Sequence, residues 1–304
     1  MNNITHKTTT LRKAIAQARV QVSSEATMQA IQNKTVPKGD VFEFARAAGL
    51  LGIKKTSDLI PDCHPLPIEF AAIRYNCEEL SVTIEVEVHA IYRTGVEVEA
   101  MHGASITALT LYDMLKPIDK GVEIKDIKLV EKKGGKSQYR DRKMPRVKVQ
   151  VTVCSDTVSQ KLKEDKSGKV ILEKVKEFGL EEASYTVIPD EPKSIEQTIQ
   201  DAQANGVRLL FFTGGTGLSI RDVTPDTIRP MLDREIPGMM EAARSYGQER
   251  MPYAMLSRGV AGMIGDMLVV TMPGSTGGAR ETMDAIFPHI LHVFNIAAGK
   301  RHEA

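Results

Sequence analysis

The stretch FFTGGTGLSIRDVTP, residues 211 to 225, indicates the fold class of the C-terminal half, because a glycine-rich loop directly follows an apolar run. Gly214, Gly215 and Gly217 permit backbone conformations and close approaches that side chains would block. In an open α/β sheet, ligands bind beyond the carboxyl ends of the strands, and this loop follows such an end. The stretch lacks both the GxxxxGK[ST] of a nucleotide P-loop and the GxGxxG dinucleotide motif. It therefore predicts a phosphate loop of another kind.

Strand and helix patterns alternate on the N-terminal side of this loop. The predicted strands are VKVQVTV (147–153), YTVIPD (185–190) and VRLLFFTGG (207–215), and helical patterns cover residues 168–180 and 194–206. This alternation is typical of parallel βαβ units. The C-terminal half is therefore predicted to be α/β with a mostly parallel sheet.

Polar groups end three strands of this half: CSD (154–156), IPD (188–190), and TGGTG with Asp222 beyond it. If carboxylates from separate strands converge, they could bind Mg²⁺ together with phosphate oxygens of a substrate. Mg²⁺ prefers one or two carboxylates plus substrate phosphates as ligands. The alternative is that Asp190 and Asp222 only cap turns, where aspartate is common. The sequence alone leaves both interpretations open.

The upstream half follows a different pattern. Helical segments at 23–33 and 40–53 precede a long antiparallel hairpin (71–92), and a helix (97–115) and a strand (122–132) follow. This half is predicted to be α+β. The stretch EKKGGKSQYRDRKMPR, residues 131–146, carries seven basic and two acidic residues without apolar periodicity. We therefore expect domains at 1–138 and 147–304, joined by a basic linker at 139–146.

Composition excludes several classes of protein. Forty basic and 39 acidic residues leave a net charge of +1, which argues against a general nucleic-acid binder. Cys63, Cys77 and Cys154 have no CxxC spacing, so neither a disulfide framework nor a zinc site is indicated. The N-terminus lacks the apolar core of a signal peptide, and no apolar run could span a bilayer. A cytoplasmic protein is expected.

Three groups of residues in the upstream half could carry chemistry. His64 lies between Pro61 and Pro65 and could be a structural hydrogen-bonding residue or a general acid or base. Asp113 and Lys116, three residues apart on the predicted helix, could be an exposed ion pair or a proton-transfer couple beside a pocket. Glu97 and Glu99 cannot share a helical face, but both could serve at a strand-to-helix turn. These alternatives stay open.

The ordered motifs VCSD, EDKSG, IPDE, TGGTGLSIRDVTPD, PGMMEAAR, MLSRGVAG and MPGSTGG resemble the molybdopterin-binding MogA/MoaB family over residues 147–295. The resemblance implies a three-layer α/β fold, a trimer, and adenylylation of molybdopterin with ATP and Mg²⁺. It assigns Asp190 and Asp222 as catalytic and metal-binding residues. It assigns a substrate pocket to Ser155, Asp156, Gly214, Gly215, Thr216, Gly217, Ser257, Pro273, Gly274 and Ser275. One departure is that Thr276, Gly277 and Gly278 stand where many relatives have a proline and a lysine.

The motifs KGDVFEFARAAGLLGIKKTSDLIPDCHPL, GVEVEA, LTLYDMLK and KKGGKS resemble the MoaC family, cyclic pyranopterin monophosphate synthase, over residues 5–138. The resemblance implies a ferredoxin-like α+β fold, hexamers with sites at dimer interfaces, and conversion of 3′,8-cyclo-7,8-dihydro-GTP to cyclic pyranopterin monophosphate with loss of pyrophosphate. It assigns Asp113 and Lys116 to catalysis. It assigns substrate contacts to Arg12, Lys38, Lys54, Cys63, His64, Glu97, Val98, Glu99 and Lys132. Asp62 and Val98 depart from the usual leucine and methionine.

Together the two series predict a bifunctional enzyme of molybdenum cofactor synthesis. We expect it to be a homo-oligomer, trimer or hexamer, that acts on pterin and GTP-derived substrates, with other enzymes of the pathway as possible partners. No catalytic metal is expected in the N-terminal domain, because lysine side chains can supply the positive charge that an expelled pyrophosphate needs. Two alternatives concern the C-terminal domain. It could be a pterin-binding or assembly module without catalysis, or a general nucleotide-binding domain unrelated to pterins.

Overall fold

The computed structural model describes residues 1–135, 146–180 and 182–299. The chain divides into two compact units, Met1–Tyr139 and Arg140–Ala304, which are treated separately below. Most of the expected linker, 139–146, lies outside the described residues, and its role as a linker stays a prediction. No helix in the described ranges is both long enough and apolar enough to cross a membrane.

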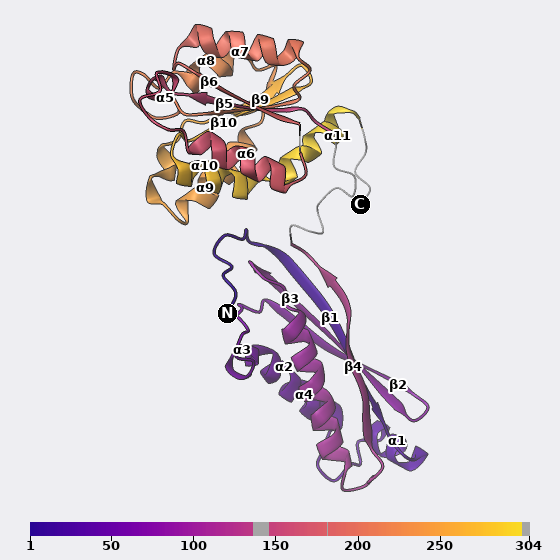
Figure 1. Cartoon of the computed structure of the whole chain (residues 1–304). Coiled ribbons are helices and arrows are strands. Elements are labelled where there is room, and N and C mark those ends of the chain that lie inside the picture. The colour runs from indigo at the N-terminus through magenta and orange to yellow at the C-terminus, as the bar shows by residue number, and fades with distance from the viewer. Residues whose placement is uncertain (136–145, 181, 300–304) are drawn as a thin grey trace. The chain divides into compact units, whose positions relative to one another are not determined.

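The N-terminal unit is a four-stranded sheet covered on one face by helices (Figure 1). Its strands have the order β2-β3-β1-β4, and every neighbouring pair is antiparallel. The elements in chain order are β1 (Thr10–Gln21), α1 (Glu25–Gln32), α2 (Val41–Lys54), α3 (Thr56–Leu59), β2 (Phe70–Glu78), β3 (Ser81–Tyr92), α4 (Glu97–Leu115) and β4 (Glu123–Lys133).

Small residues let the long helix α4 lie close to both α2 and the sheet. Alternate residues of β1 and β3 are buried, as a strand with one face on the core requires. A Cβ built on Gly103 would lie 2.5 Å from the Cγ1 atom of Ile53 in α2, and one on Gly49 would lie 2.1 Å from Thr107 Oγ1. Glycine at these positions therefore fixes how α4 lies on the core, and with it the positions of both ends of α4.

The C-terminal unit has a six-stranded sheet with the order β6-β5-β7-β10-β9-β8. The first four of these strands are parallel, and β9 and β8 add an antiparallel edge, so the predicted mostly parallel sheet is confirmed. The elements are β5 (Val149–Cys154), α5 (Asp156–Ser159), α6 (Ser167–Glu177), β6 (Ala183–Ile188), α7 (Pro192–Ala204), β7 (Leu209–Thr213), α8 (Thr224–Ile228), η1 (Arg229–Met231), β8 (Arg234–Glu235), α9 (Pro237–Gln248), η2 (Pro252–Leu256), β9 (Ala261–Ile264), β10 (Met267–Met272), α10 (Thr276–Ile286), η3 (His289–His292) and α11 (Val293–Ala297).

Helices cover both faces of this second sheet. Helices α6, α9 and α10 lie on one face, and α7 and α8 lie on the other (Figure 1). In β7, the side chains of Leu209 and Phe211 belong to the hydrophobic core on one face of the sheet, whereas Leu210 and Phe212 belong to the core on the other face. A strand buried on both faces reads as a continuous apolar run, which accounts for the sequence LLFF before the glycine-rich loop.

Candidate functional sites

Four strand ends meet at one edge of the C-terminal sheet. The Gly214 N–H after β7 donates to the carbonyl oxygen of Met272 at 3.2 Å, and Thr213 Oγ1 donates to the Pro273 carbonyl at 2.8 Å. The Ser155 N–H, after β5, donates to the carbonyl oxygen of Ile188 at 3.0 Å. The predicted convergence of these polar strand ends is therefore present in the structure.

The glycines of the TGGTG loop are required by close approaches and by backbone conformation. Gly214 has φ +102°, and a Cβ there would lie 2.2 Å from the Cys154 carbonyl oxygen. Gly215 has φ +61°, and its Cβ would lie 2.5 Å from Asp190 Oδ1 and 2.3 Å from Thr224 Oγ1. Any side chain at these two positions would displace the loop from the strand ends.

This loop presents backbone donors. Its carbonyls are engaged, because the Gly215 carbonyl accepts from the Thr224 N–H at 3.2 Å and the Thr216 carbonyl accepts from the Arg258 N–H at 3.1 Å. The N–H groups of Gly215, Thr216 and Gly217 donate to no acceptor among the described residues. Successive unengaged N–H groups in such a turn make an anion-binding concavity.

The start of helix α10 lies at the same edge. Ser275 caps this helix, since its Oγ accepts from the Gly278 N–H at 3.2 Å. The altered sequence Thr276-Gly277-Gly278 forms the first turn of the helix, and Thr276 and Gly274 line the same cavity as Gly215. The positive end of the helix dipole thus adds to the backbone donors of the loop.

Three carboxyl groups surround this edge. The Asp190 N–H donates to Asp156 Oδ1 at 3.1 Å, and Arg221 pairs with the other oxygen of Asp156. Asp222 accepts from the Ser219 N–H at 2.8 Å. Burial, followed by the negative charges of Asp156 and Asp222, raises the pKa of Asp190 to about 6. By contrast, the Asp190 N–H and Arg221 lower the pKa of Asp156.

Two cavities open at this edge, with volumes of about 590 and 300 Å³. Gly215 and Gly274 line both of them. Asp156 and Asp190 line the larger cavity, and Asp222 lines the smaller one. Of the twelve residues that the sequence places in this site, all but the helix cap Ser275 line one cavity or the other: Ser155, Asp156, Asp190, Gly214, Gly215, Thr216, Gly217, Asp222, Ser257, Pro273 and Gly274.

In the N-terminal unit, two lysines form ion pairs with Asp113 near the C-terminal end of α4. Lys116 Nζ lies 2.7 Å from Asp113 Oδ1, and Lys38 Nζ lies 2.7 Å from Oδ2 and 2.8 Å from the Asp113 carbonyl oxygen. Lys116 and then Lys38 lower the pKa of Asp113 to about 2, and Asp113 raises the pKa of Lys116. The carboxylate is therefore ionised at neutral pH and orients two ammonium groups.

The other end of α4 holds a buried carboxyl group. Glu99 is 2% exposed, accepts a hydrogen bond from Cys63 Sγ at 3.2 Å, and leaves its Oε2 atom without a partner. Burial raises the pKa of Glu99, and burial together with the Glu99 contact raises the pKa of Cys63 to about 11. His64, the next residue, is half-buried. Burial thus disfavours the charged form of both side chains.

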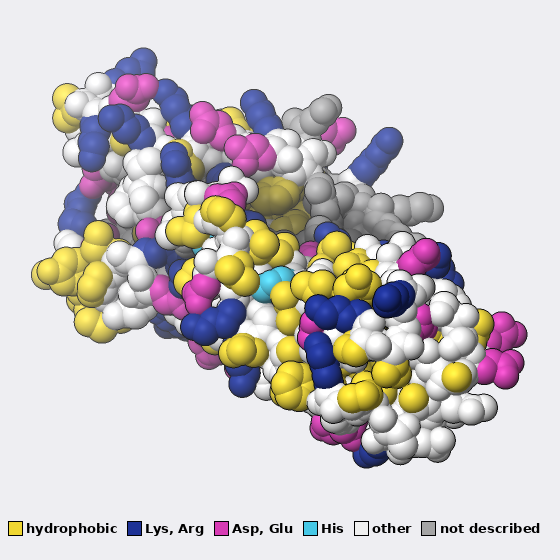
Figure 2. Space-filling view, turned by 90° about the horizontal axis from the view of Figure 1, so that it is seen from below, with side chains coloured by type: hydrophobic (Ala, Val, Ile, Leu, Met, Phe, Trp, Pro, Cys, Tyr) yellow, Lys and Arg dark blue, Asp and Glu magenta, His cyan; other side chains and the backbone are white. Residues whose placement is uncertain are grey.

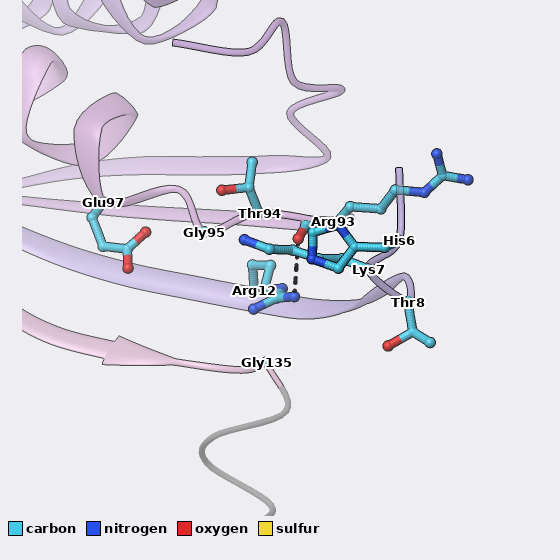
Figure 3. Close-up of a pocket in the computed structure, with 9 residues that line it drawn as sticks. All are labelled: His6, Lys7, Thr8, Arg12, Arg93, Thr94, Gly95, Glu97 and Gly135. Atoms are coloured by element: carbon cyan, nitrogen blue, oxygen red, sulfur yellow. Dashed lines mark hydrogen bonds between the residues drawn. The ribbon is translucent and has the colours of Figure 1, made fainter. Parts of the chain in front are cut away.

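A third group lines a cavity of about 440 Å³, which we name the basic cavity (Figure 3). It is bounded by His6, Lys7, Thr8, Arg12, Arg93, Thr94, Gly95, Glu97 and Gly135. Arg12 is held in place by hydrogen bonds from Nε to the Tyr92 carbonyl at 3.2 Å and from Nη2 to the Arg93 carbonyl at 3.3 Å. Glu97 lies 3.4 Å from Lys132 Nζ.

Two family models match the chain. The MoaC family matches residues 1–135, and the family described as "Probable molybdopterin binding domain" matches residues 150–292. The molybdenum cofactor biosynthesis bifunctional protein of Chlorobaculum tepidum is 37% identical over 305 residues, which cover 99% of this chain and 96% of that protein. The chain belongs to the family of bifunctional molybdenum cofactor biosynthesis proteins.

Each half also has relatives of its own. The cyclic pyranopterin monophosphate synthase of Pelobacter propionicus is 50% identical over 139 residues, covering 45% of this chain and 86% of that protein. The crystal structure of the molybdopterin biosynthesis enzyme MoaB from Thermus thermophilus is 38% identical, covers 51% of this chain and 98% of that chain, and has a TM-score of 0.48. By its two family models, this chain of the bifunctional family joins a MoaC half to a half that matches the molybdopterin binding domain family.

The site residues predicted for the MoaC half fall into separate groups. Lys38, Asp113 and Lys116 lie together, and Cys63 contacts Glu99. Arg12 and Glu97 line the basic cavity, with Lys132 beside it. Lys54, at the end of α2, and Val98, at the start of α4, are both exposed. Asp62 pairs with the amino group of Met1 at 2.7 Å.

Several residues of these sites were not assigned from the sequence. Arg258 donates to the carbonyls of Gly217 at 2.8 Å and Asp222 at 2.6 Å and so holds the TGGTG loop. Arg221 and Thr224 stand in the quoted motif RDVTP but received no role, although each contacts a site carboxylate. Other unassigned lining residues are Lys163, Lys166 and Tyr253 in the C-terminal half and His6, Lys7 and Arg93 in the MoaC half.

Proposed function

We propose that the C-terminal unit adenylylates the terminal phosphate of molybdopterin, with ATP as the donor and Mg²⁺ as the cofactor. The observation that carries this proposal is the position of Asp190. It lies beside a loop of backbone N–H donors, and burial and neighbouring carboxylates raise its pKa to about 6. A bound cation would stabilise the ionised form of Asp190, and the N–H donors of the loop would stabilise a bound phosphate.

Asp190 and Asp222 fit the role of Mg²⁺ ligands. Among the described residues no group of three or more His, Cys, Asp or Glu side chains could hold a metal. Mg²⁺ needs only one or two carboxylates when substrate phosphates supply the other oxygens. When bound, the cation neutralises phosphate charge during adenylyl transfer. The chain's own contribution is to orient the phosphates through the N–H groups of Gly215, Thr216 and Gly217.

A pterin-dependent assay tests this activity. The purified chain is incubated with molybdopterin, ATP and Mg²⁺, and pyrophosphate release is measured. Release is expected only when the pterin is present, and Asp222→Asn should abolish it. Tight pterin binding without release would instead favour a non-catalytic pterin-binding module. ATP turnover without pterin would favour a general nucleotide-binding domain.

For the N-terminal unit, we infer conversion of 3′,8-cyclo-7,8-dihydro-GTP to cyclic pyranopterin monophosphate and pyrophosphate. With a pKa of about 2, Asp113 is a weak base. Its function is therefore to hold Lys116 and Lys38 as cations toward the substrate, and Lys116 can donate a proton. Glu99, whose pKa is raised by burial, is a second candidate proton donor, at the far end of α4.

The two ends of α4 support a site that is shared between two copies of the chain. Fourteen residues separate Glu99 from Asp113, which corresponds to about 21 Å along a helix. One nucleotide cannot readily reach both groups within one unit. Apolar side chains of α4 are exposed at Val98, next to Glu99, and at Met101, Leu109 and Tyr112, between the two groups. Hydrophobic side chains form several clusters among charged ones on the side of the protein drawn in Figure 2. An oligomer, trimer or hexamer, would cover such side chains and bring the two ends together.

The strand order of this unit supports assignment to the ferredoxin-like class. Two β-α-β segments, β1-α1/α2/α3-β2 and β3-α4-β4, interlock in a fully antiparallel sheet. This is the arrangement of a split βαβ fold. The fold places α2 and α4 on one face of the sheet.

Substitutions at the Asp113 cluster test the N-terminal activity. Asp113→Asn and Lys116→Ala should each lower kcat for pyranopterin formation by about 10²-fold or more, because a positioned acid typically contributes this much. Both side chains are about half exposed, so folding should be unaffected. Asp58→Asn, which removes the similar exposed pair with Lys55, is the control and should retain activity. Near-normal turnover by Asp113→Asn would disprove the assigned role.

A further inference from the structure

Arg258 joins the TGGTG loop to the segment that leads into β9. Its backbone N–H donates to the Thr216 carbonyl at 3.1 Å, Nε donates to the Gly217 carbonyl at 2.8 Å, and Nη2 donates to the Asp222 carbonyl at 2.6 Å. Nη1 lies 3.0 and 2.9 Å from the two carboxylate oxygens of Asp226, in α8. Arg258 is not among the described residues that line either cavity of this unit. Any effect of Arg258 on a ligand therefore passes through other groups.

These contacts set the direction of peptide groups in the loop. In a planar trans peptide, the carbonyl oxygen and the N–H of the next residue point to opposite sides. Because the Thr216 and Gly217 carbonyls are held toward Arg258, the N–H groups of Gly217 and Leu218 face away from it. Thr216 and Gly217 also line the smaller cavity, and their N–H groups belong to the anion-binding donors described above. Arg258 thus helps to fix the direction of these donors.

The same side chain fixes the backbone of Asp222. Nη2 of Arg258 holds the Asp222 carbonyl, while the Asp222 carboxylate accepts from the Ser219 N–H within the loop. A Cβ built on Gly217 would lie 2.8 Å from Asp222 Oδ2, so this carboxylate lies against the glycine whose carbonyl Arg258 binds. One guanidinium therefore sets the distance between the phosphate donors of the loop and a proposed Mg²⁺ ligand.

The shape of the arginine side chain matters here more than its charge. The guanidinium is paired with Asp226, so its positive charge is offset before any ligand binds. A guanidinium is a planar fork whose N–H groups reach acceptors in separate directions, whereas a lysine ammonium is a single point of charge. A lysine at position 258 can hold one of these carbonyls, but it cannot hold both of them together with Asp226.

We propose that Arg258 is a positioning residue for adenylyl transfer, which places the loop donors and the Asp222 carboxylate through the carbonyls of Gly217 and Asp222. The assignment rests on the adenylyltransferase activity proposed above. In that reaction an oxygen of the pterin phosphate bonds to the α-phosphorus of ATP. The bond from this phosphorus to the α,β-bridging oxygen breaks, and the electron pair leaves with pyrophosphate. Arg258 takes no part in these bond changes, but a displaced loop slows them because the reacting phosphates are no longer aligned.

Substitutions at position 258 test this role in the whole chain. Pyrophosphate release is measured with ATP and Mg²⁺, and molybdopterin binding is titrated separately without either. Arg258→Gln should lower kcat by about 10²-fold, the effect of a displacement of about 1 Å, and should raise the Kd for molybdopterin about tenfold. Arg258→Lys should give intermediate values. Arg229→Gln, which removes an exposed arginine paired with Glu235, is the matched control and should change neither value.

Asp226→Asn separates positioning from a purely structural role. It weakens the link between Arg258 and α8 but leaves the carbonyl contacts in place. It should therefore lower Tm slightly and keep both kcat and the pterin Kd within about twofold of the wild type, since an exposed ion pair contributes little. If Arg258 only ties segments together, Asp226→Asn will instead lose activity in parallel with Arg258→Gln.

The inference is overturned by that parallel loss, or if folded Arg258→Gln binds and adenylylates the pterin as the wild type does. It is also overturned if the wild type does not bind molybdopterin. The proposed activity fails separately, if the wild type binds the pterin but releases no pyrophosphate. In that case, weaker pterin binding by folded Arg258→Gln, with unchanged binding by Asp226→Asn, would still support the positioning of the loop by Arg258.

Discussion

At Asp190, burial and two neighbouring negative charges act on one carboxyl group. Both effects oppose ionisation and together raise its pKa to about 6, whereas the contact with Thr224 lowers it. The folded C-terminal unit therefore binds this proton more tightly than the unfolded chain does. Because the folded pKa is the higher one, stability falls as the pH rises from about 4 to about 6, and the cost is fully present at neutral pH.

This linkage predicts an unusual effect of a substitution at a site residue. In buffer with EDTA, Asp190→Asn should raise the Tm of the C-terminal unit at pH 7, since it removes a charge that the fold disfavours. The difference from the wild type should vanish below about pH 4, where Asp190 is protonated. Thermal unfolding at several pH values measures both effects. Equal Tm values at pH 7 would show that the environment of Asp190 does not penalise its charge.

At the scale of elements, helix α4 joins the two chemical groups of the N-terminal unit, and its packing on α2 sets where they lie. Gly103 faces Ile53 with no room for a methyl group: the added Cβ would lie 2.5 Å from Ile53 Cγ1 and 3.2 Å from Val86 Cγ1. The neighbouring atoms belong to fully buried side chains. The interface therefore cannot absorb a larger residue without moving the helix.

Gly103→Ala should therefore destabilise the N-terminal unit by about 1–3 kcal/mol, the usual cost of overpacking, despite alanine's better helix propensity. Urea unfolding of the full-length chain, followed by a probe in this unit, measures the change. Gly238→Ala in α9 is the control. No atom lies within 4 Å of its added Cβ, so it should be neutral or slightly stabilising. An unchanged unfolding midpoint in Gly103→Ala would contradict the tight packing.

In the C-terminal half, the sequence predicted β5, α6, β6, α7 and β7, because the signals of these elements are local. Parallel strands buried on both faces, such as LLFF, and glycines at strand ends mark the fold and its ligand edge directly. No element after β7 was predicted, including strand β10 and helices α9 and α10, and the short antiparallel edge strands β8 and β9 carry no comparable signal. In the N-terminal half, α4 was predicted at its observed bounds, Glu97–Leu115. The central strand β1 was not predicted, because LRKAIAQAR is rich in helix-forming residues and tertiary pairing with β3 and β4 overrides that propensity.

Site residues, like the elements, could be predicted where their signals are local in the sequence. Residues that follow a strand, such as Asp190, could be placed at the ligand edge from the order of elements alone. The basic cavity could not be found this way, because Lys7 and Arg93 are 86 positions apart and meet only through the pairing of Thr10 with Tyr92. The predicted length of the helix already implied that Asp113 and Glu99 lie far apart. The motifs, however, assigned both residues to one substrate site and did not indicate this separation.

At the scale of the whole molecule, a site shared between copies predicts complementation. Glu99→Gln and Asp113→Asn should each be inactive in pyranopterin formation. If they are denatured together and refolded as mixed oligomers, some interfaces should combine an intact Glu99 end with an intact Asp113 end. Activity should then recover to about a quarter of the wild-type value, because about half of randomly paired closed dimers are mixed and each mixed dimer has one intact site out of two. Mixtures that stay inactive, although the oligomers have exchanged subunits, would argue for sites within single units.

Gly215 and Gly274 each line both cavities of the C-terminal unit, so the two cavities adjoin at these glycines. Two ligands could occupy them independently and still lie next to each other there, without a lid or a hinge to bring them together. Adenylyl transfer would then need no conformational step, and its rate should depend little on solvent viscosity. Substitutions in the outer walls could change which ligand either cavity binds, whereas a side chain on Gly215 would clash with Asp190 and Thr224, and one on Gly274 would press on the backbone of Gly214.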